Sequence, residues 1–122
     1  MSGEVNLTLL PELLEEIHLN NNFFCGEICL TRLPGGLELL DLSKNMFRGN
    51  IDLTSLPAGL VTLLLHNNSF LGWTDFRRLP QEIESFNVSN TGLEGTVYVP
   101  ADLFDEFHVE NSNVEKFSAV NA

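Results

Sequence analysis

Basic residues are scarce in this chain of 122 residues, which has six Lys and Arg against 17 Asp and Glu and a formal net charge of −11. Nucleic acid and anionic membranes are bound through basic faces, so this balance argues against both and favours a basic protein partner. The sequence also lacks an apolar run long enough to span a membrane and the charged-then-apolar start of a signal peptide. We therefore expect no nucleic-acid binding and no membrane insertion; localisation stays open, with an intracellular location favoured.

The chain does have an internal repeat. Pro11, Pro34, Pro57 and Pro80 are spaced by 23 residues, and each begins a unit of the type LPxxLxxLxLxxNxFxGxI. In the third unit Thr74 replaces the last isoleucine, and the fourth unit is looser, with Thr91 for the asparagine and Leu93 for the phenylalanine. The spacing from Pro80 to Pro100 is only 20 residues, so the fourth unit is shortened. A fixed period of this length is typical of solenoid proteins. We predict a single domain made of a half-coil (1–13), regular coils (about 14–82), a shortened coil (83–103) and a degenerate terminal coil (104–122).

This unit resembles the leucine-rich repeat family over about residues 3–117. The Gly-x-Ile that follows the phenylalanine is similar to the plant-type subclass, in which proline usually comes next. Here the continuation is ICLTRLP or IDLTSLP, a form that resembles leucine-rich repeat proteins of kinetoplastid protozoa. The resemblance implies a solenoid with a parallel concave sheet and a protein-binding role.

The residues favour the same fold class on physical grounds. In LxxLxL the last two leucines alternate with one polar position, so both face the same side of a short strand. One such strand cannot bury its apolar side alone, whereas stacked units can. We expect a mainly β solenoid of about five coils, with few or no helices. The segment GxIDLTSLP also alternates, and we interpret it as extended, with a possible second short strand on the convex side.

Two columns of the repeat are predicted to be structural. An asparagine amide can both donate and accept, so stacked asparagines can bridge adjacent coils where the chain leaves the strand. The predicted asparagine ladder consists of Asn22, Asn45 and Asn68, with Thr91 and Ser112 as weaker substitutes. The predicted phenylalanine spine consists of Phe24, Phe47 and Phe70. The glycine after each phenylalanine is expected to adopt a backbone conformation closed to other residues.

Function in a solenoid usually resides on the side chains between the core positions. Three outward columns on the concave strands supply the predicted partner-binding residues, which are Glu16, His18, Leu39, Asp41, Thr62, Leu64, His66, Ser85 and Asn87. Leu39 and Leu64 form an apolar pair with a polar rim, which is a plausible partner contact. Single exposed leucines are also ordinary on protein surfaces. Trp73 should face outward, either as a binding anchor or as a cover over Thr74, and we favour the cover.

No spacing in the sequence indicates catalysis, a cofactor or a metal. Cys25 and Cys29 lie too far apart along an extended segment to pair, so free thiols are expected. His18 and His108 share a column but stand four coils apart, ~19 Å, and cannot share a metal ion. His18 beside Glu16 could be imagined as an acid–base pair, but open faces lack the pocket that tunes such groups. We expect that the chain is not an enzyme.

The leading hypothesis is a non-catalytic protein–protein interaction module that binds its partner on the concave face. One alternative is a structural or capping segment of a longer repeat array, with no partner of its own. Another is the recognition part of an enzyme whose catalytic domain lies outside this chain. Exposed sheet edges at the ends of a solenoid can also pair with another copy, so end-to-end self-association is possible.

Overall fold

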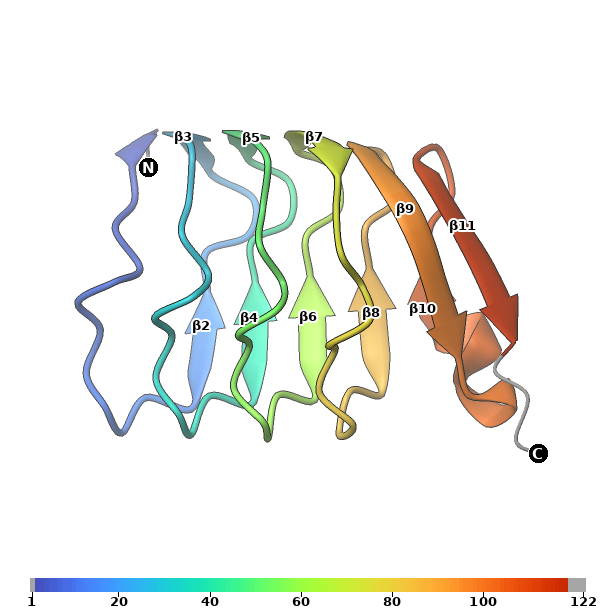
Figure 1. Ribbon diagram of the computed structural model, residues 1–122. Helices are drawn as coiled ribbons and strands as arrows, with labels where there is room; N and C mark the ends of the chain where they lie inside the picture. The colour runs from blue at the N-terminus through green and yellow to red at the C-terminus, as the bar shows by residue number, and fades with distance from the viewer. Residues whose placement is uncertain (1, 119–122) are drawn as a thin grey trace.

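The protein is a mainly β solenoid with very little helix, seen in a computed structural model that describes residues 2–118 (Figure 1). The chain winds between two sheets in which every pair of neighbouring strands is parallel. The five-stranded sheet consists of β2 (Glu16–His18), β4 (Leu39–Asp41), β6 (Thr62–Leu64), β8 (Ser85–Asn87) and β10 (Phe107–His108). The six-stranded sheet consists of β1 (Ser2–Glu4), β3 (Phe23–Gly26), β5 (Met46–Gly49), β7 (Ser69–Trp73), β9 (Gly92–Val99) and β11 (Asn113–Ser118). The described helix is the 3₁₀ turn η1 (Ala101–Glu106). The predicted fold class is confirmed.

The core is a set of columns that run through the stack. One inward-facing residue of each strand in the five-stranded sheet pairs in register with its neighbours and is at most 6% exposed. These residues are Ile17, Leu40, Leu63, Phe86 and Phe107. Burial of one such side chain stabilises the fold by roughly 1.5–3 kcal/mol, and no coil could bury its own row without the next.

The phenylalanine spine lies where the chain passes from one sheet to the other. Adjacent rings of Phe24, Phe47 and Phe70 stack with centroids 6.3 and 6.2 Å apart and interplanar angles of 17° and 10°. Phe47 and Phe70 are fully buried, and Leu93 continues the column. The stacked rings agree with the predicted spine and keep each coil aligned with the next.

The asparagine ladder bridges coils at the same turn. Asn45 Nδ2 donates to the Leu19 carbonyl of the preceding coil at 2.8 Å, and its Oδ1 accepts from Phe24 N at 3.1 Å. Asn68 repeats both bonds one coil later, to Leu42 O and from Phe47 N. The ladder is therefore confirmed for these two residues.

The other residues of the asparagine column also make bonds within their own coil. Asn22 donates to the carbonyls of Leu19 and Asn20. The Thr91 hydroxyl donates to Val88 O at 2.7 Å, and Ser112 donates to the carbonyl three residues before it. A hydroxyl is shorter than an amide, so these substitutes satisfy groups of their own coil.

The return arms, defined as residues 27–38, 50–61 and 74–84, carry the chain from the six-stranded sheet back to the five-stranded one. The segment GxIDLTSLP is extended and not helical, as predicted, but it does not form the possible second strand. That strand comes earlier, at Met46–Gly49, and the chain then turns at Thr54. Asp52 Oδ1 accepts bonds from the backbone N–H and the hydroxyl of Thr54 and so stabilises the turn. The alternation reflects burial of Ile51 and Leu53 rather than strand pairing.

Gly49, which ends β5, shows why the repeat requires glycine there. Its φ is +85°, and a Cβ at this position would lie 2.8 Å from the side chain of Glu27. A side chain would therefore be strained twice, by the backbone and by the neighbouring coil, as the sequence predicts.

The shortened coil replaces the return arm with a straight strand. β9 is eight residues long and pairs with β11 over six positions, whereas the other strand pairs span two or three. Figure 1 shows β9 running from one end of the coil to the other, beside a return arm that bends. Three fewer residues leave no slack for a bend, so this segment is extended.

Candidate interaction surfaces

The outward residues of the five-stranded sheet form the columns that the repeat predicts. One row places Glu16 beside Leu39, Thr62 and Ser85 in register. The next places His18, Asp41, Leu64, Asn87 and His108 side by side. The sheet thus brings all but one of the predicted binding residues onto one face, and the exception is His66, just beyond β6.

Leu39 and Leu64 are less open than the prediction requires. They lie on neighbouring strands, since Leu39 pairs with Thr62 and Asp41 pairs with Leu64, and both leucines are half-buried. Each offers part of a side chain, so the apolar contact area at the middle of this face is small.

The third predicted column follows the strands and consists of Asn20, Ser43, His66, Ser89 and Glu110, but not all of these residues face outward. Ser43 and Ser89 are only 3% and 8% exposed. The Ser43 hydroxyl donates to Asp41 Oδ1 at 2.6 Å, and the Ser89 hydroxyl donates to Asn87 Oδ1 at the same distance. The two serines therefore pack under the strand ends, because the aspartate and asparagine need them as partners in a turn.

His66 is half-buried, and its Nδ1 is enclosed without a hydrogen-bond partner among the described residues. Burial lowers the pKa of His66, with Asp41 opposing that effect and Lys44 adding to it. Burial therefore favours the neutral imidazole, whose Nδ1 is shielded from solvent.

The other histidines of this face pair with carboxylates. His18 Nε2 lies 2.9 Å from Glu16 Oε1, and His108 Nδ1 lies 3.6 Å from Glu110 Oε1. The His18 and Glu16 side chains are 55% and 62% exposed, and those of His108 and Glu110 are 44% and 64% exposed. Within residues 2–118 no group of three or more His, Cys, Asp or Glu side chains is placed to hold a metal ion.

A second surface, which the sequence reasoning missed, lies on the outer side of the six-stranded sheet. Trp73, Tyr98 and Phe117 are 63%, 66% and 46% exposed. The Tyr98 and Phe117 rings face each other with centroids 5.8 Å apart. Trp73 thus lies mostly open to solvent, while Thr74 beside it is only 2% exposed. Tyr98 could have been found from Val97-Tyr98-Val99, because in a strand the two buried valines place the tyrosine on the outer face.

A groove borders this surface, between the last return arm and β9. Two adjoining hollows share Phe76, Arg77 and Tyr98 as walls, and Trp73 and Thr96 line one of them. The groove exists because a bent arm lies next to a straight strand, so the two cannot nest as equal coils do. It is thus a consequence of the three-residue shortening of the fourth unit.

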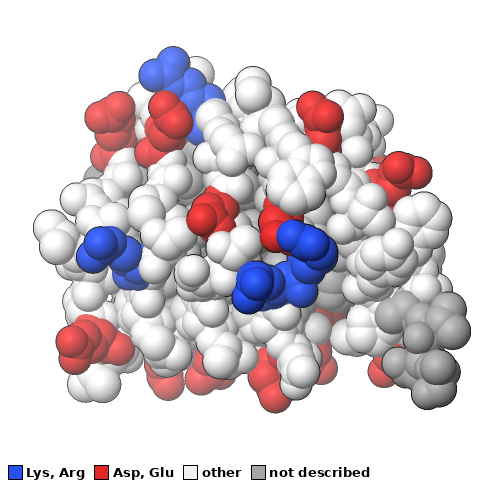
Figure 2. Space-filling view, in the orientation of Figure 1, with Lys and Arg blue, Asp and Glu red and all other residues white. Residues whose placement is uncertain are grey.

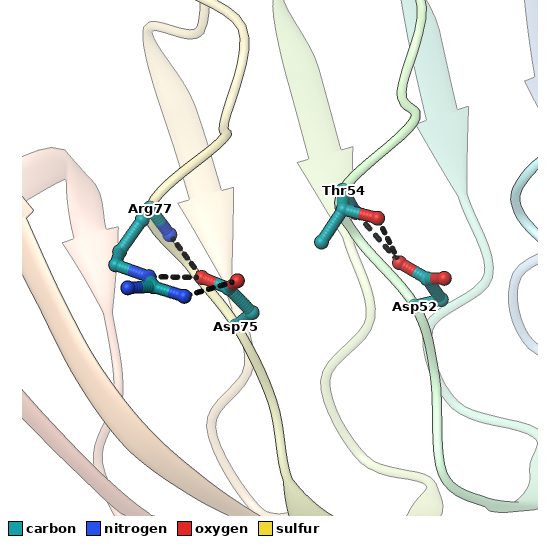
Figure 3. Close-up of polar contacts among 4 residues, drawn as sticks. All are labelled: Asp52, Thr54, Asp75 and Arg77. Carbon is teal, nitrogen blue, oxygen red and sulfur yellow. Dashed lines mark hydrogen bonds and ion pairs between the residues drawn. The ribbon is translucent and has the colours of Figure 1, made fainter.

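Arg77 is fixed at the rim of the groove by Asp75 (Figure 3). Its Nε and Nη2 donate to the two carboxylate oxygens at 3.0 Å each, and its backbone N donates to Oδ1 at 2.9 Å. These hydrogen bonds lower the pKa of Asp75 to about 2. Asp52 and Thr54 form the corresponding turn on the preceding arm (Figure 3).

Cys25 and Cys29 are both free thiols, the first half-buried and the second exposed. Cys29 Sγ lies 3.1 Å from the Thr31 hydroxyl, and hydrogen bonds from Thr31 lower the pKa of the thiol. Cys29 thus occupies the position that Asp52 and Asp75 hold in the following arms.

No family model, curated protein or solved structure matches the chain. The function of the protein is therefore inferred from this geometry. Among the described residues, no helix has the length and apolar character needed to cross a membrane.

Proposed function

We propose that the protein is a non-catalytic protein-interaction module of the leucine-rich repeat type, which binds a protein partner over the outer face of the five-stranded sheet. The resemblance of the 23-residue unit supports the family, together with the stacked parallel strands and the asparagine ladder.

One observation carries the functional part. The parallel sheet holds outward side chains in register, with Leu39, Leu64 and His66 partly exposed near its middle. Preorganised side chains lower the entropy cost of binding, so even a modest apolar patch can act as an anchor.

The test is affinity capture from source cells with the wild-type chain and a Leu39→Arg, Leu64→Arg double variant. A matched control is Met46→Arg, which places the same charge on an exposed residue of the other sheet. We expect at least one partner that the control retains and the double variant loses, followed by direct binding of that purified partner. Because the two leucines are half-buried, circular dichroism must show that the double variant is folded, and a Leu39→Ala, Leu64→Ala variant should weaken the same partner. Equal capture by all variants would refute the proposal.

A further inference from the structure

We propose that the outer face of β7, β9 and β11, with the groove beside it, binds an extended lysine- or arginine-containing segment of a partner protein. This surface belongs to the six-stranded sheet, so the inference does not depend on binding at the five-stranded one.

The first argument is the open aromatic surface. Register places Tyr98 beside Phe117, and it places Trp73 in the row that continues through Glu94 to Asn113. Exposed tryptophan and tyrosine are expensive to leave in water and are enriched at binding hot spots. Tyr98 and Phe117 form a pair of facing rings, and Trp73 borders a hollow that it shares with Tyr98, so the three exposed rings lie around one region of this face.

The second argument is the charge between the rings. Glu94 and Glu115 project from the same face, both are exposed, and neither forms an ion pair with any described residue. The sequence has no Lys or Arg between Arg78 and Lys116. In Figure 2 the side chains over β11, at the right of the view, are red and white, with no blue visible.

The one lysine on these strands is turned away from the surface. Lys116 Nζ donates to the carbonyls of Phe104 and Phe107 at 2.8 and 2.9 Å and lies 4.1 Å from the centre of the Phe104 ring. These contacts hold η1 against β11, so the Lys116 ammonium group does not neutralise Glu94 or Glu115.

Together, rings and carboxylates select a cation with an apolar stem. Lys and Arg side chains lay their methylenes on aromatic faces, and their charged heads interact with ring faces and carboxylates. Anionic ligands are disfavoured by Glu94 and Glu115 and by the net charge of −11. At the groove, the charge of Arg77 is offset by its two bonds to Asp75.

The groove indicates an extended ligand. Its two hollows follow one another along the flank of β9, past Tyr98, and are bounded at one end by Trp73 and at the other by Pro100 and Phe107. Aromatic-lined grooves of this shape suit extended or polyproline segments, which are already stiff before they bind.

The test uses fluorescein-labelled decapeptides, one of alternating lysine and proline and one with glutamate in place of lysine. The chain has a single tryptophan, so Trp73 emission reports binding at the site, and anisotropy gives the affinity. We expect saturable binding of the lysine peptide, with a change in Trp73 emission, and no binding of the glutamate peptide. A Glu94→Gln, Glu115→Gln variant should weaken binding by about tenfold, and Tyr98→Ser by a similar factor.

Two controls separate this site from general attraction to an acidic protein. A Glu12→Gln, Glu38→Gln variant removes the same charge from exposed positions elsewhere and should bind within about twofold of wild type. The Leu39→Arg, Leu64→Arg variant should also bind the lysine peptide, so failure of the proposed function would not affect this result. Absence of saturable binding, equal binding of both peptides, or equal loss in the Glu12 and Glu38 control would overturn the inference.

Discussion

Replacement of Asn68 by alanine tests the claim that the asparagine ladder holds the coils together. The Asn68 amide donates to Leu42 O, Leu65 O and His66 O at 2.8, 3.3 and 3.2 Å, and its Oδ1 accepts from Phe47 N at 3.1 Å. The residue is 9% exposed, so water cannot easily replace these bonds.

The expected cost follows from what each partner loses. Phe47 N–H loses its bond to the Asn68 side chain in a buried site, which costs ~1–3 kcal/mol. Leu42 O keeps a bond from Asn45 Nδ2 at 3.2 Å, and His66 O keeps one from Lys44 N at 3.0 Å, so their losses are partial. We expect Asn68→Ala to lower the free energy of unfolding by roughly 2–4 kcal/mol.

Asn50→Ala is the matched control, because Asn50 also bridges to the next coil but is exposed. Its Nδ2 donates to Trp73 O at 2.9 Å, and water can replace it, so the loss should stay below ~1 kcal/mol. The assay is urea unfolding followed by circular dichroism, with the slope against denaturant checked for each variant. Equal losses for the two variants, or a loss below ~1 kcal/mol for Asn68→Ala, would refute the reasoning.

Two further predictions concern pH. Arg77→Gln should raise the pKa of Asp75 from about 2 toward its ordinary 3.8 in an NMR titration. A lowered carboxyl pKa stabilises the fold at pH values above the ordinary pKa, and this stabilisation is lost as the pH falls toward 2. The variant should therefore lose less stability than wild type between pH 5 and 2. An unchanged pKa would show that Arg77 is not the cause. Burial lowers the pKa of His66, so protonation favours the unfolded chain and stability should fall as the pH drops below about 6.5. In urea unfolding at pH 7 and pH 5, His66→Gln should lose less stability over this interval than wild type, and an equal loss would contradict the assignment.

Much of the frame could be predicted because the repeat reports its own register. Phe24, Phe47 and Phe70 occupy the same position in consecutive units. When the units stack, equivalent positions lie next to one another, so the 23-residue spacing predicts that the three rings are in contact. The same logic succeeded for Asn45 and Asn68, whose amides can reach the neighbouring coil.

The surfaces were harder to predict, because the alternation of apolar and polar residues does not show which hydrogen bonds a polar side chain forms. Ser43 is polar and follows a strand, yet it is buried because Asp41 needs its hydroxyl. Asp52 lies in an alternating segment, yet it closes a turn with Thr54. In both cases a short side-chain bond overrides the period-two reading.

The sequence by itself determined the solenoid, its parallel strands and the structural columns, because a 23-residue period admits few ways to bury one apolar row per unit. Tertiary structure alone decided which polar residues remain open and where the surface is hollowed. Tyr98 and Phe117 face each other only because β9 straightens and pairs with β11 over six residues, and Trp73 borders a hollow that it shares with Tyr98. The lost arc of three residues is visible in the sequence, but the groove it leaves beside a bent arm depends on the paths of two neighbouring coils in space.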